Sequence, residues 1–167
     1  MNTILPKSNL EATIFLNNLT QSETNLEIVL ETFFYHKRED LQIVSLKILV
    51  KWKYSKINEI VKDWLILHSQ KYFWFRYSIL SLSIDFLDED FFWWLLDKYL
   101  EYNYGSNTFG FGILMHLMEK FVSVQMRAKF ELKVKESKNL KQWKCLIFWN
   151  YNFVYRDYFL KIISSLE

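Results

Sequence analysis

The sequence predicts an all-α protein in which antiparallel helical hairpins stack as a short solenoid or a compact bundle of about eight to ten helices. Three observations support this fold class. Only three glycines and one proline occur among 167 residues, whereas proteins built from β-sheets need more of both for their turns. Apolar residues recur at helical spacing, and apolar dipeptides recur at a longer period.

The longer period appears in two interleaved series of dipeptides. Members of the first series follow one another at spacings of 31, 34 and 33 residues: Ile48-Leu49, Ile79-Leu80, Ile113-Leu114 and Leu146-Ile147. Members of the second series are each 32 residues apart: Ile28-Val29, Ile60-Val61 and Phe92-Trp93. Two series with one period indicate two helices per unit, which is typical of arrays of helical hairpins.

Polar residues mark where several helices begin. Ser8 and Glu11 have the spacing of a capping box, in which hydroxyl and carboxylate each accept the other residue's backbone N–H. Ser22, Ser55 and Asp88 are expected N-caps of later helices, and short polar links favour antiparallel neighbours. We expect helices over residues 8–19, 23–36, 39–53, 56–69, 72–86, 89–103, 108–123, 125–136, 139–150 and 154–166.

The period and the amphipathic helices together resemble the class of HEAT-like repeat proteins over residues 22–150. The length of 167 residues indicates a single domain, 1–167, in which we expect capping helices at 1–21 and 151–167 on either side of the repeats. The stretch "FWFRYSIL" (73–80), followed by an Asp-rich turn and an aromatic helix, is similar to the alkylpurine DNA glycosylases. That family uses Asp, Trp and Arg in a DNA-facing groove, and these have no residue-by-residue counterpart here.

Composition narrows the classes of protein that fit. The chain is 51% hydrophobic and 19% aromatic, which excludes a disordered chain. A net charge of +2 does not by itself imply a polyanionic partner, and one cysteine permits no intrachain disulfide. The N-terminus lacks the pattern of a signal peptide, and the longest charge-free stretch, 102–118, contains Asn and Gly. We expect a cytoplasmic protein without a membrane span, from a bacterium or a phage.

Residues that carry common chemistry are isolated in this sequence. The histidines His36, His68 and His116 have no metal-ligand spacing, and Cys145 lies in the apolar "WKCLIFW", where we expect a buried, inert thiol. Residues 105–112 hold all three glycines but lack the Lys and Ser or Thr of a phosphate-binding loop. We therefore expect no catalytic residue, no metal site, no cofactor and no enzymatic activity.

The helix expected at 89–103 has two aromatic sides. A helical wheel places Phe92 and Tyr99 on a core stripe and turns Trp93 and Trp94 to the opposite side, among carboxylates. Two interpretations stay open: the indoles pack on a neighbouring hairpin, or they form an exposed patch that binds a basic partner. The local charge over 85–101 is −5. The predicted partner-binding residues are Asp85, Asp88, Glu89, Asp90, Trp93, Trp94, Asp97, Glu101, Tyr102 and Tyr104.

A second segment, 127–144, has the opposite charge, +5. It is either a solvated helix face with a lysine-rich link or a site for phosphate groups. The sequence thus predicts a dipolar molecule with separate acidic and basic segments. The alternative phosphate-binding residues are Arg127, Lys129, Lys138, Lys141 and Lys144.

These observations favour a binding function over catalysis. The chain is similar in type to the immunity proteins that neutralise antibacterial toxins, which implies a non-catalytic inhibitor that covers the surface of a toxin or effector. Its partner is expected to be a protein with a basic surface that contacts the acidic aromatic helix. The alternative is a HEAT-like nucleic-acid-binding or DNA-repair protein that holds phosphates with its lysines.

Overall fold

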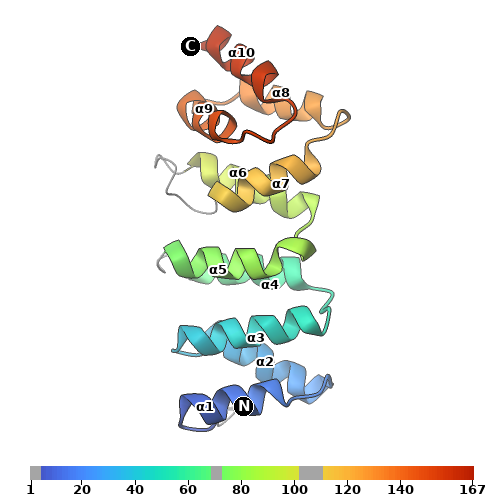
Figure 1. Cartoon of the computed structure of the whole chain (residues 1–167), viewed down its shortest axis with the longest axis vertical. Coiled ribbons are helices and arrows are strands. Elements are labelled where there is room, and N and C mark those ends of the chain that lie inside the picture. Colours follow the sequence, from blue (N-terminus) through green and yellow to red (C-terminus); the bar gives the residue numbers. More distant parts are fainter. Residues whose placement is uncertain (1–4, 69–72, 102–110) are drawn as a thin grey trace. The chain divides into compact units, whose positions relative to one another are not determined.

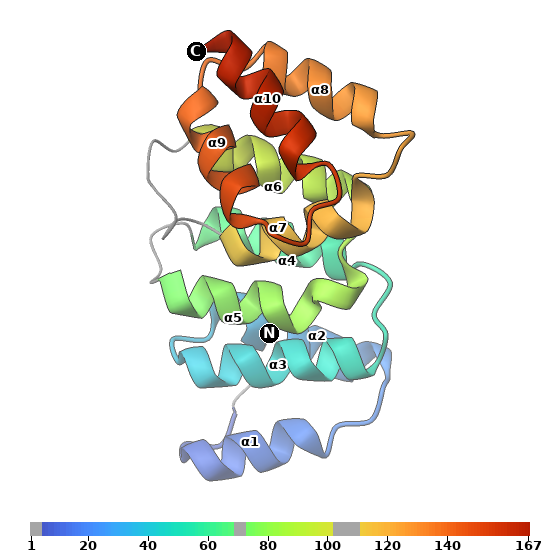
Figure 2. The same ribbon diagram turned by 45° about the horizontal axis from the view of Figure 1, so that its top comes forward.

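The computed structural model describes residues 5–68, 73–101 and 111–167, and these residues are all-α (Figures 1 and 2). They form ten α-helices, one 3₁₀ helix and no strand. Consecutive helices pack as hairpins, among them α2–α3, α4–α5, α6–α7 and α9–α10, which confirms the predicted fold class. The elements are α1 (Asn9–Asn17), α2 (Glu23–Tyr35), α3 (Glu39–Lys51), α4 (Ile57–Leu67), α5 (Phe73–Ser83), η1 (Ile84–Phe86), α6 (Glu89–Glu101), α7 (Phe111–Phe121), α8 (Arg127–Lys135), α9 (Leu140–Trp149) and α10 (Arg156–Leu166).

The contacts group the chain into two compact units, residues 1–87 and residues 88–167. In the first unit, α3 packs against both α1 and α5, so these three helices form one layer. Helices α2 and α4 pack on this layer through α3 and α5, as Figures 1 and 2 show from two directions. The boundaries proposed for the two capping helices stay a prediction.

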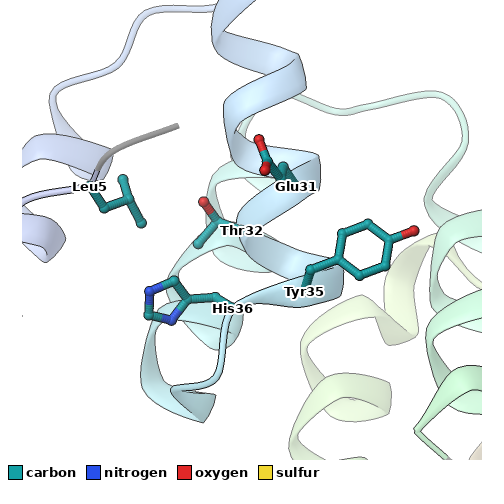
Figure 3. Close-up of a pocket in the computed structure, with 5 residues that line it drawn as sticks. All are labelled: Leu5, Glu31, Thr32, Tyr35 and His36. Carbon is teal, nitrogen blue, oxygen red and sulfur yellow. The ribbon is translucent and has the colours of Figure 1, made fainter. Parts of the chain in front are cut away.

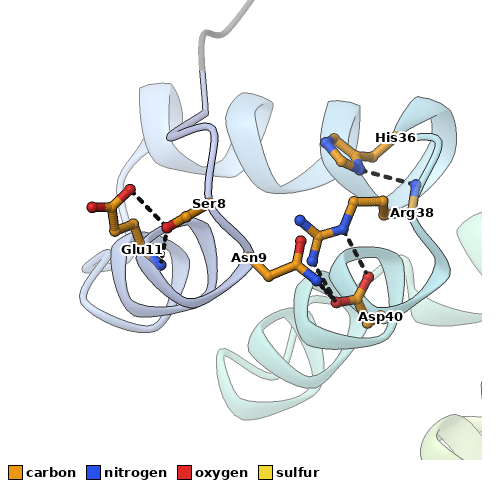
Figure 4. A network of polar contacts seen from close by, with 6 residues as sticks. All are labelled: Ser8, Asn9, Glu11, His36, Arg38 and Asp40. Carbon is orange, nitrogen blue, oxygen red and sulfur yellow. Dashed lines mark hydrogen bonds and ion pairs between the residues drawn. The ribbon is translucent and has the colours of Figure 1, made fainter.

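Three of the four predicted helix starts are confirmed. Ser8 Oγ accepts the N–H of Glu11 at 3.2 Å and donates to the Glu11 carboxylate at 2.7 Å (Figure 4). The side chains of the two capping-box residues are thus hydrogen-bonded to each other. Ser22 Oγ accepts the N–H of Asn25 at 3.2 Å, and Asp88 Oδ1 accepts that of Phe91 at 2.8 Å. Ser55 was expected to cap α4, and this is wrong, because the N-cap residue is Lys56, which has no side-chain cap.

A polar network fixes the start of α1 beside α3 (Figure 4). Arg38 contacts the Asp40 carboxylate through Nε at 3.3 Å and Nη2 at 2.6 Å. Asn9 of α1 donates to the same carboxylate at 3.3 Å. The backbone N–H of Arg38 also donates to His36 Nδ1 at 3.1 Å, so this histidine supports the turn between α2 and α3.

Helix α2 ends on donors from α4. The last carbonyls of a helix have no partner within it and need another donor when they are buried. Trp64 Nε1 donates to the carbonyl of Phe33 at 3.2 Å, and His68 Nε2 donates to that of Phe34 at 2.8 Å. The Trp64 indole also stacks on the Phe33 ring at a centroid distance of 5.9 Å. Two successive hairpins are thus joined by hydrogen bonds as well as by apolar packing.

The dipeptide period marks the core. All eight residues of the first series are buried, at 4% exposure or less. In the second series only Ile28 is half-buried, and the other five residues are buried. The period of the sequence therefore corresponds to the repeat of buried positions in successive hairpins.

The second unit has an aromatic core centred on Phe130 of α8. Its ring centroid lies 4.9 Å from that of Trp143, 4.8 Å from Phe159, 5.9 Å from Phe153 and 6.3 Å from Trp93. These partners come from α6, α9, α10 and the loop before α10. Among the described residues, no helix is both long enough and apolar enough to cross a lipid bilayer.

Candidate functional site

Trp93 of α6 is buried, at 8% exposure. Its Nε1 donates to Glu89 Oε1 at 3.0 Å, and Lys129 Nζ of α8 lies over its ring, 4.3 Å from the centroid. Of the two interpretations left open by the sequence, the exposed patch is therefore wrong for Trp93, because α8 covers this side of α6. Trp94 is half-buried, and its ring meets that of Phe91 edge-on at 5.3 Å.

The predicted acidic and basic segments contact each other within the second unit. Lys129 Nζ lies 3.9 Å from Glu89 Oε1, and Lys133 Nζ lies 2.5 Å from Asp97 Oδ1. Glu101 pairs with Lys98 on its own helix at 2.7 Å. The prediction of a dipolar molecule is therefore wrong for these groups, because residues far apart in sequence are brought together when α8 packs near α6.

The other predicted partner-binding residues are spread over several places. Asp85 is exposed in η1 of the first unit, whereas Asp88 and Asp90 are exposed at the start of α6 in the second. Tyr102 and Tyr104 lie outside the described residues, as do residues 105–110 of the glycine-rich loop. Partner binding by these residues stays a prediction.

The alternative phosphate-binding residues have different surroundings. Arg127 lies over the ring of Tyr158, 5.2 Å from its centroid, Lys129 lies over Trp93, and Lys144 pairs with Glu167 at 2.6 Å. The remaining two, Lys138 and Lys141, are exposed and make no ion pair with any described residue.

The groups with potential chemistry are dispersed in the structure. The ring nitrogens of His36 and His68 contact backbone groups, His116 is exposed, and the described residues contain no group of three side chains placed to hold a metal. Cys145 is half-buried, so the expected full burial is wrong: it lies at the edge of the buried stripe of α9. Burial raises the pKa of Tyr99 well above its usual range, and the neighbouring Cys145 adds to this effect.

The described part of the first unit contains two small hollows. A cavity of about 100 Å³ is lined by side chains of α2 and by Leu5 (Figure 3). A shallow groove of about 340 Å³ lies between α3 and α5 and is lined by Ile43, Lys47, Tyr77, Ser78, Ser81 and Leu82. Ligand sites for small molecules have volumes of about 300–1,000 Å³ and enclose most of the ligand, so the cavity is too small and the groove too open to define one.

A group of exposed aromatic side chains lies where α9 ends. We call Phe148, Trp149, Tyr151, Val154 and Arg156 the α9–α10 cluster. Trp149 is 51% exposed, Tyr151 68% and Val154 88%. The Trp149 ring meets Phe148 edge-on at 5.4 Å and Tyr151 edge-on at 6.4 Å, so the three rings form one contiguous apolar surface.

Arg156 holds this cluster together. Its guanidinium carbon lies 5.4 Å from the Phe148 ring centroid and 5.2 Å from that of Tyr151. Its Nε donates to the Phe148 carbonyl at 3.1 Å, and Nη1 pairs with Asp157 at 3.1 Å. Stacking and hydrogen bonding together fix the orientation of the side chain, which keeps part of its surface open to solvent.

The loop that carries the cluster is anchored on both sides of Tyr151. Asn150 is buried, and its Nδ2 donates to the carbonyl of Met115 in α7 at 3.1 Å. Phe153 is buried and stacks on Phe159 at 5.9 Å. The exposed rings are therefore held on an ordered loop, although nothing buries them within the described structure.

The cluster was not predicted from the sequence, because it lies where the expected repeats, up to residue 150, meet the expected C-terminal capping helix, 151–167. One feature of the sequence did point to it. The buried stripe of α9 ends with Leu146 and Ile147, and Phe148 and Trp149 follow directly, outside the buried series. Two large aromatic residues beyond the last core dipeptide are candidates for the surface.

A hydrogen bond to the Glu131 carboxylate of α8 joins the start of α10 to α8. Lys135 Nζ and Tyr158 Oη both donate to Glu131, and these hydrogen bonds lower the pKa of the Glu131 carboxyl. A lowered pKa in the folded state stabilises the fold above the unfolded-state pKa, and this contribution is lost as pH falls through the folded-state pKa.

We expect Tyr158→Phe to raise the pKa of Glu131 toward its usual range, because one of its two donors is removed. A pH titration of the side-chain carboxyl resonances by NMR measures this pKa directly. Tyr151→Phe removes a hydroxyl from the exposed loop instead and serves as the control. An unchanged Glu131 pKa in Tyr158→Phe would show that the lysine alone sets it.

The fold defines a class, an all-α protein of consecutive helical hairpins. Comparison with protein-family models, with curated proteins and with solved structures returns no match to this chain.

Proposed function

We propose that the chain is a non-catalytic protein that binds a partner protein and acts by covering its surface, as an immunity-type inhibitor of a toxin or other effector does. The observation that supports this best is the α9–α10 cluster. Residues that dominate protein–protein binding energy are most often Trp, Tyr and Arg. Trp149, Tyr151 and Arg156 lie together in the cluster, partly exposed and held in fixed positions by their contacts.

The acidic helix supports the proposal less well. Its Trp93 is buried, and three of its carboxylates, Glu89, Asp97 and Glu101, already contact lysines. Asp88 and Asp90 are exposed, and we propose that they contact a basic region of a partner. These acids are therefore proposed to lie at the edge of an interaction, with the main anchors in the α9–α10 cluster.

We expect the double variant Trp149→Ala/Tyr151→Ala to bind the partner at least about 30-fold more weakly than the wild type, because the loss of even one such anchor costs about 2 kcal/mol. Helix content should not change, since both side chains are exposed. The partner is first isolated with the wild-type chain as bait, and calorimetry then gives the dissociation constants. An inhibitor should also reduce the activity of that partner at a one-to-one ratio.

The control is Trp74→Ala, because Trp74 of α5 is an exposed tryptophan of the other unit, at 75% exposure. Its replacement should leave the affinity within about twofold, since Trp74 is not part of the cluster and few residues carry most of the binding energy. Equal affinities for the double variant and the wild type would rule out the cluster as the binding surface.

A second candidate function, nucleic-acid binding or DNA repair on a HEAT-like scaffold, is supported by the exposed face of α9. Lys141, Lys144 and Phe148 are all exposed on this helix, at spacings of three and four residues, so cations and an aromatic ring share one face. Salt discriminates between the two functions. Binding driven by phosphate contacts weakens by about one power of salt concentration per contact, whereas an interface anchored by aromatic residues weakens much less.

A further inference from the structure

We infer that the α9–α10 cluster binds an acidic polypeptide segment, one that places an Asp or Glu carboxylate beside a large apolar side chain. Arg156 is the residue that contacts the carboxylate, and Trp149 and Tyr151 receive the apolar side chain. The inference rests on the proposed function and adds the chemistry of the partner. It differs from the sequence-based expectation, in which the partner surface is basic.

Cationic residues predominate in the stretch of sequence that leads into and carries the cluster. From Ser137 to Arg156 the chain contains four cationic residues and no Asp or Glu: Lys138, Lys141, Lys144 and Arg156. Two carboxylates among the described residues, Asp157 and Glu167, follow this stretch in sequence and pair with Arg156 and Lys144. Exposed pairs of this kind are weak, so a carboxylate of a partner can replace either one.

Arg156 has the geometry that carboxylate recognition needs. A guanidinium group binds a carboxylate through two parallel N–H donors, and its affinity rises when the plane is fixed before binding. Nε is already used by the Phe148 carbonyl, and the rings of Phe148 and Tyr151 hold the plane. Nη2 makes no hydrogen bond to a described residue. Nη1 pairs with Asp157, and a carboxylate of a ligand can replace that exposed pair. Nη1 and Nη2 therefore form the edge of the guanidinium that is open to a ligand.

The ring arrangement favours a polypeptide over a nucleic acid. Bases stack on open aromatic faces, but the Arg156 guanidinium covers one face each of Phe148 and Tyr151. Trp149 stands nearly perpendicular to both neighbours, at interplanar angles of 90° and 89°. Successive bases therefore find no series of parallel faces, whereas a single apolar side chain fits against rings that meet edge to face.

Selection from a random twelve-residue peptide library tests the inference. The full wild-type chain is the target, and peptides that also bind Trp149→Ala/Tyr151→Ala are removed. We expect the remaining peptides to be enriched in Asp or Glu next to Trp, Phe or Leu. For the tightest peptide, Arg156→Gln should weaken binding at least about tenfold, and Arg156→Lys should restore only part of the loss because Lys lacks the two-pronged geometry.

A double-mutant cycle shows whether Arg156 and the acid touch each other. Changing the selected acid to its amide should weaken binding to the wild type about tenfold and should have little further effect on Arg156→Gln. Arg127→Gln is the matched control, because Arg127 also lies over aromatic rings, those of Tyr155 and Tyr158, but outside the cluster. It should leave peptide affinity unchanged, and circular dichroism checks that every variant keeps its helices.

Each other outcome has a definite meaning. Cluster-dependent peptides that lack acidic enrichment, or that are indifferent to Arg156→Gln, overturn the acidic partner and leave the proposed binding function intact. The absence of any cluster-dependent peptide counts against both proposals. If a twelve-nucleotide single-stranded oligothymidylate binds the cluster more tightly than the best peptide, the ligand is a nucleic acid and the inference is wrong.

Discussion

Replacing Phe130 with alanine is expected to lower the free energy of unfolding by about 3–5 kcal/mol, the range typical of a fully buried phenylalanine. Phe130 has no exposed surface, and its ring contacts aromatic side chains from four other segments of the second unit. Those segments lie on different elements, so their side chains cannot all move inward to fill the space. The cost should therefore lie near the upper end of the range.

Urea unfolding followed by circular dichroism measures this effect. The control is Leu132→Ala, two residues along the same helix, because Leu132 is exposed and should change stability by no more than about 0.5 kcal/mol. A loss below about 1 kcal/mol for Phe130→Ala would mean that α8 does not pack on the core through this ring.

Replacing Trp64 is expected to have an effect of similar size in the first unit, and two variants separate its two roles. Trp64→Ala removes a fully buried indole and should cost about 3–5 kcal/mol. Trp64→Phe keeps most of the apolar contact but removes the N–H that the Phe33 carbonyl accepts. Leaving that buried acceptor without a donor should cost about 1–3 kcal/mol.

Hydrogen exchange adds a local measurement to the global unfolding curve. In Trp64→Phe the amides of the last turn of α2 should exchange faster, because that turn ends on the Trp64 and His68 donors. Ile66→Ala on the same helix is the control, since Ile66 is exposed and its loss should change stability by about 0.5 kcal/mol or less. Unchanged exchange in Trp64→Phe would show that the indole acts only through packing.

The helices were predictable from local features of the sequence. Capping side chains at Ser8, Ser22 and Asp88 satisfy backbone N–H groups close to them in the chain, so their effect is visible without tertiary structure. The apolar dipeptides were equally informative, because a buried stripe repeats whenever hairpins of equal length stack. Ser55 failed as a cap because Ser55 and Lys56 belong to a turn and α4 starts after Lys56.

Two features of the sequence provided different information about the burial of Trp93. The dipeptide series placed it with Ile60 and Val61, at positions that the structure buries. The helical wheel placed it among carboxylates and left packing on a neighbour and exposure both open. A wheel describes one helix alone and contains no information about α8, whose Lys129 and Phe130 cover the indole. The repeat period includes the packing of neighbouring helices, so it gave the correct side.

The charged segments and the exposed cluster depend on contacts that the sequence does not encode locally. Lys133 and Asp97 are 36 residues apart in sequence and form an ion pair. The net charge summed over a short segment of sequence therefore overestimated the net charge of the corresponding surface. The aromatic residues number 32, and nothing local in the sequence separates the exposed Trp149 and Tyr151 from buried rings such as Phe130 and Trp143. That distinction required the positions of α7 and α10 around the loop.

The capping of α2 by side chains of α4 has a consequence for the order of folding during synthesis. A nascent chain that has left the ribosome only as far as residue 60 contains all of α2 but lacks the indole of Trp64 and the imidazole of His68, which complete its last turn. The final turn of α2 therefore becomes stable only after about one further hairpin has emerged, so maturation of this region proceeds in steps set by the repeat length.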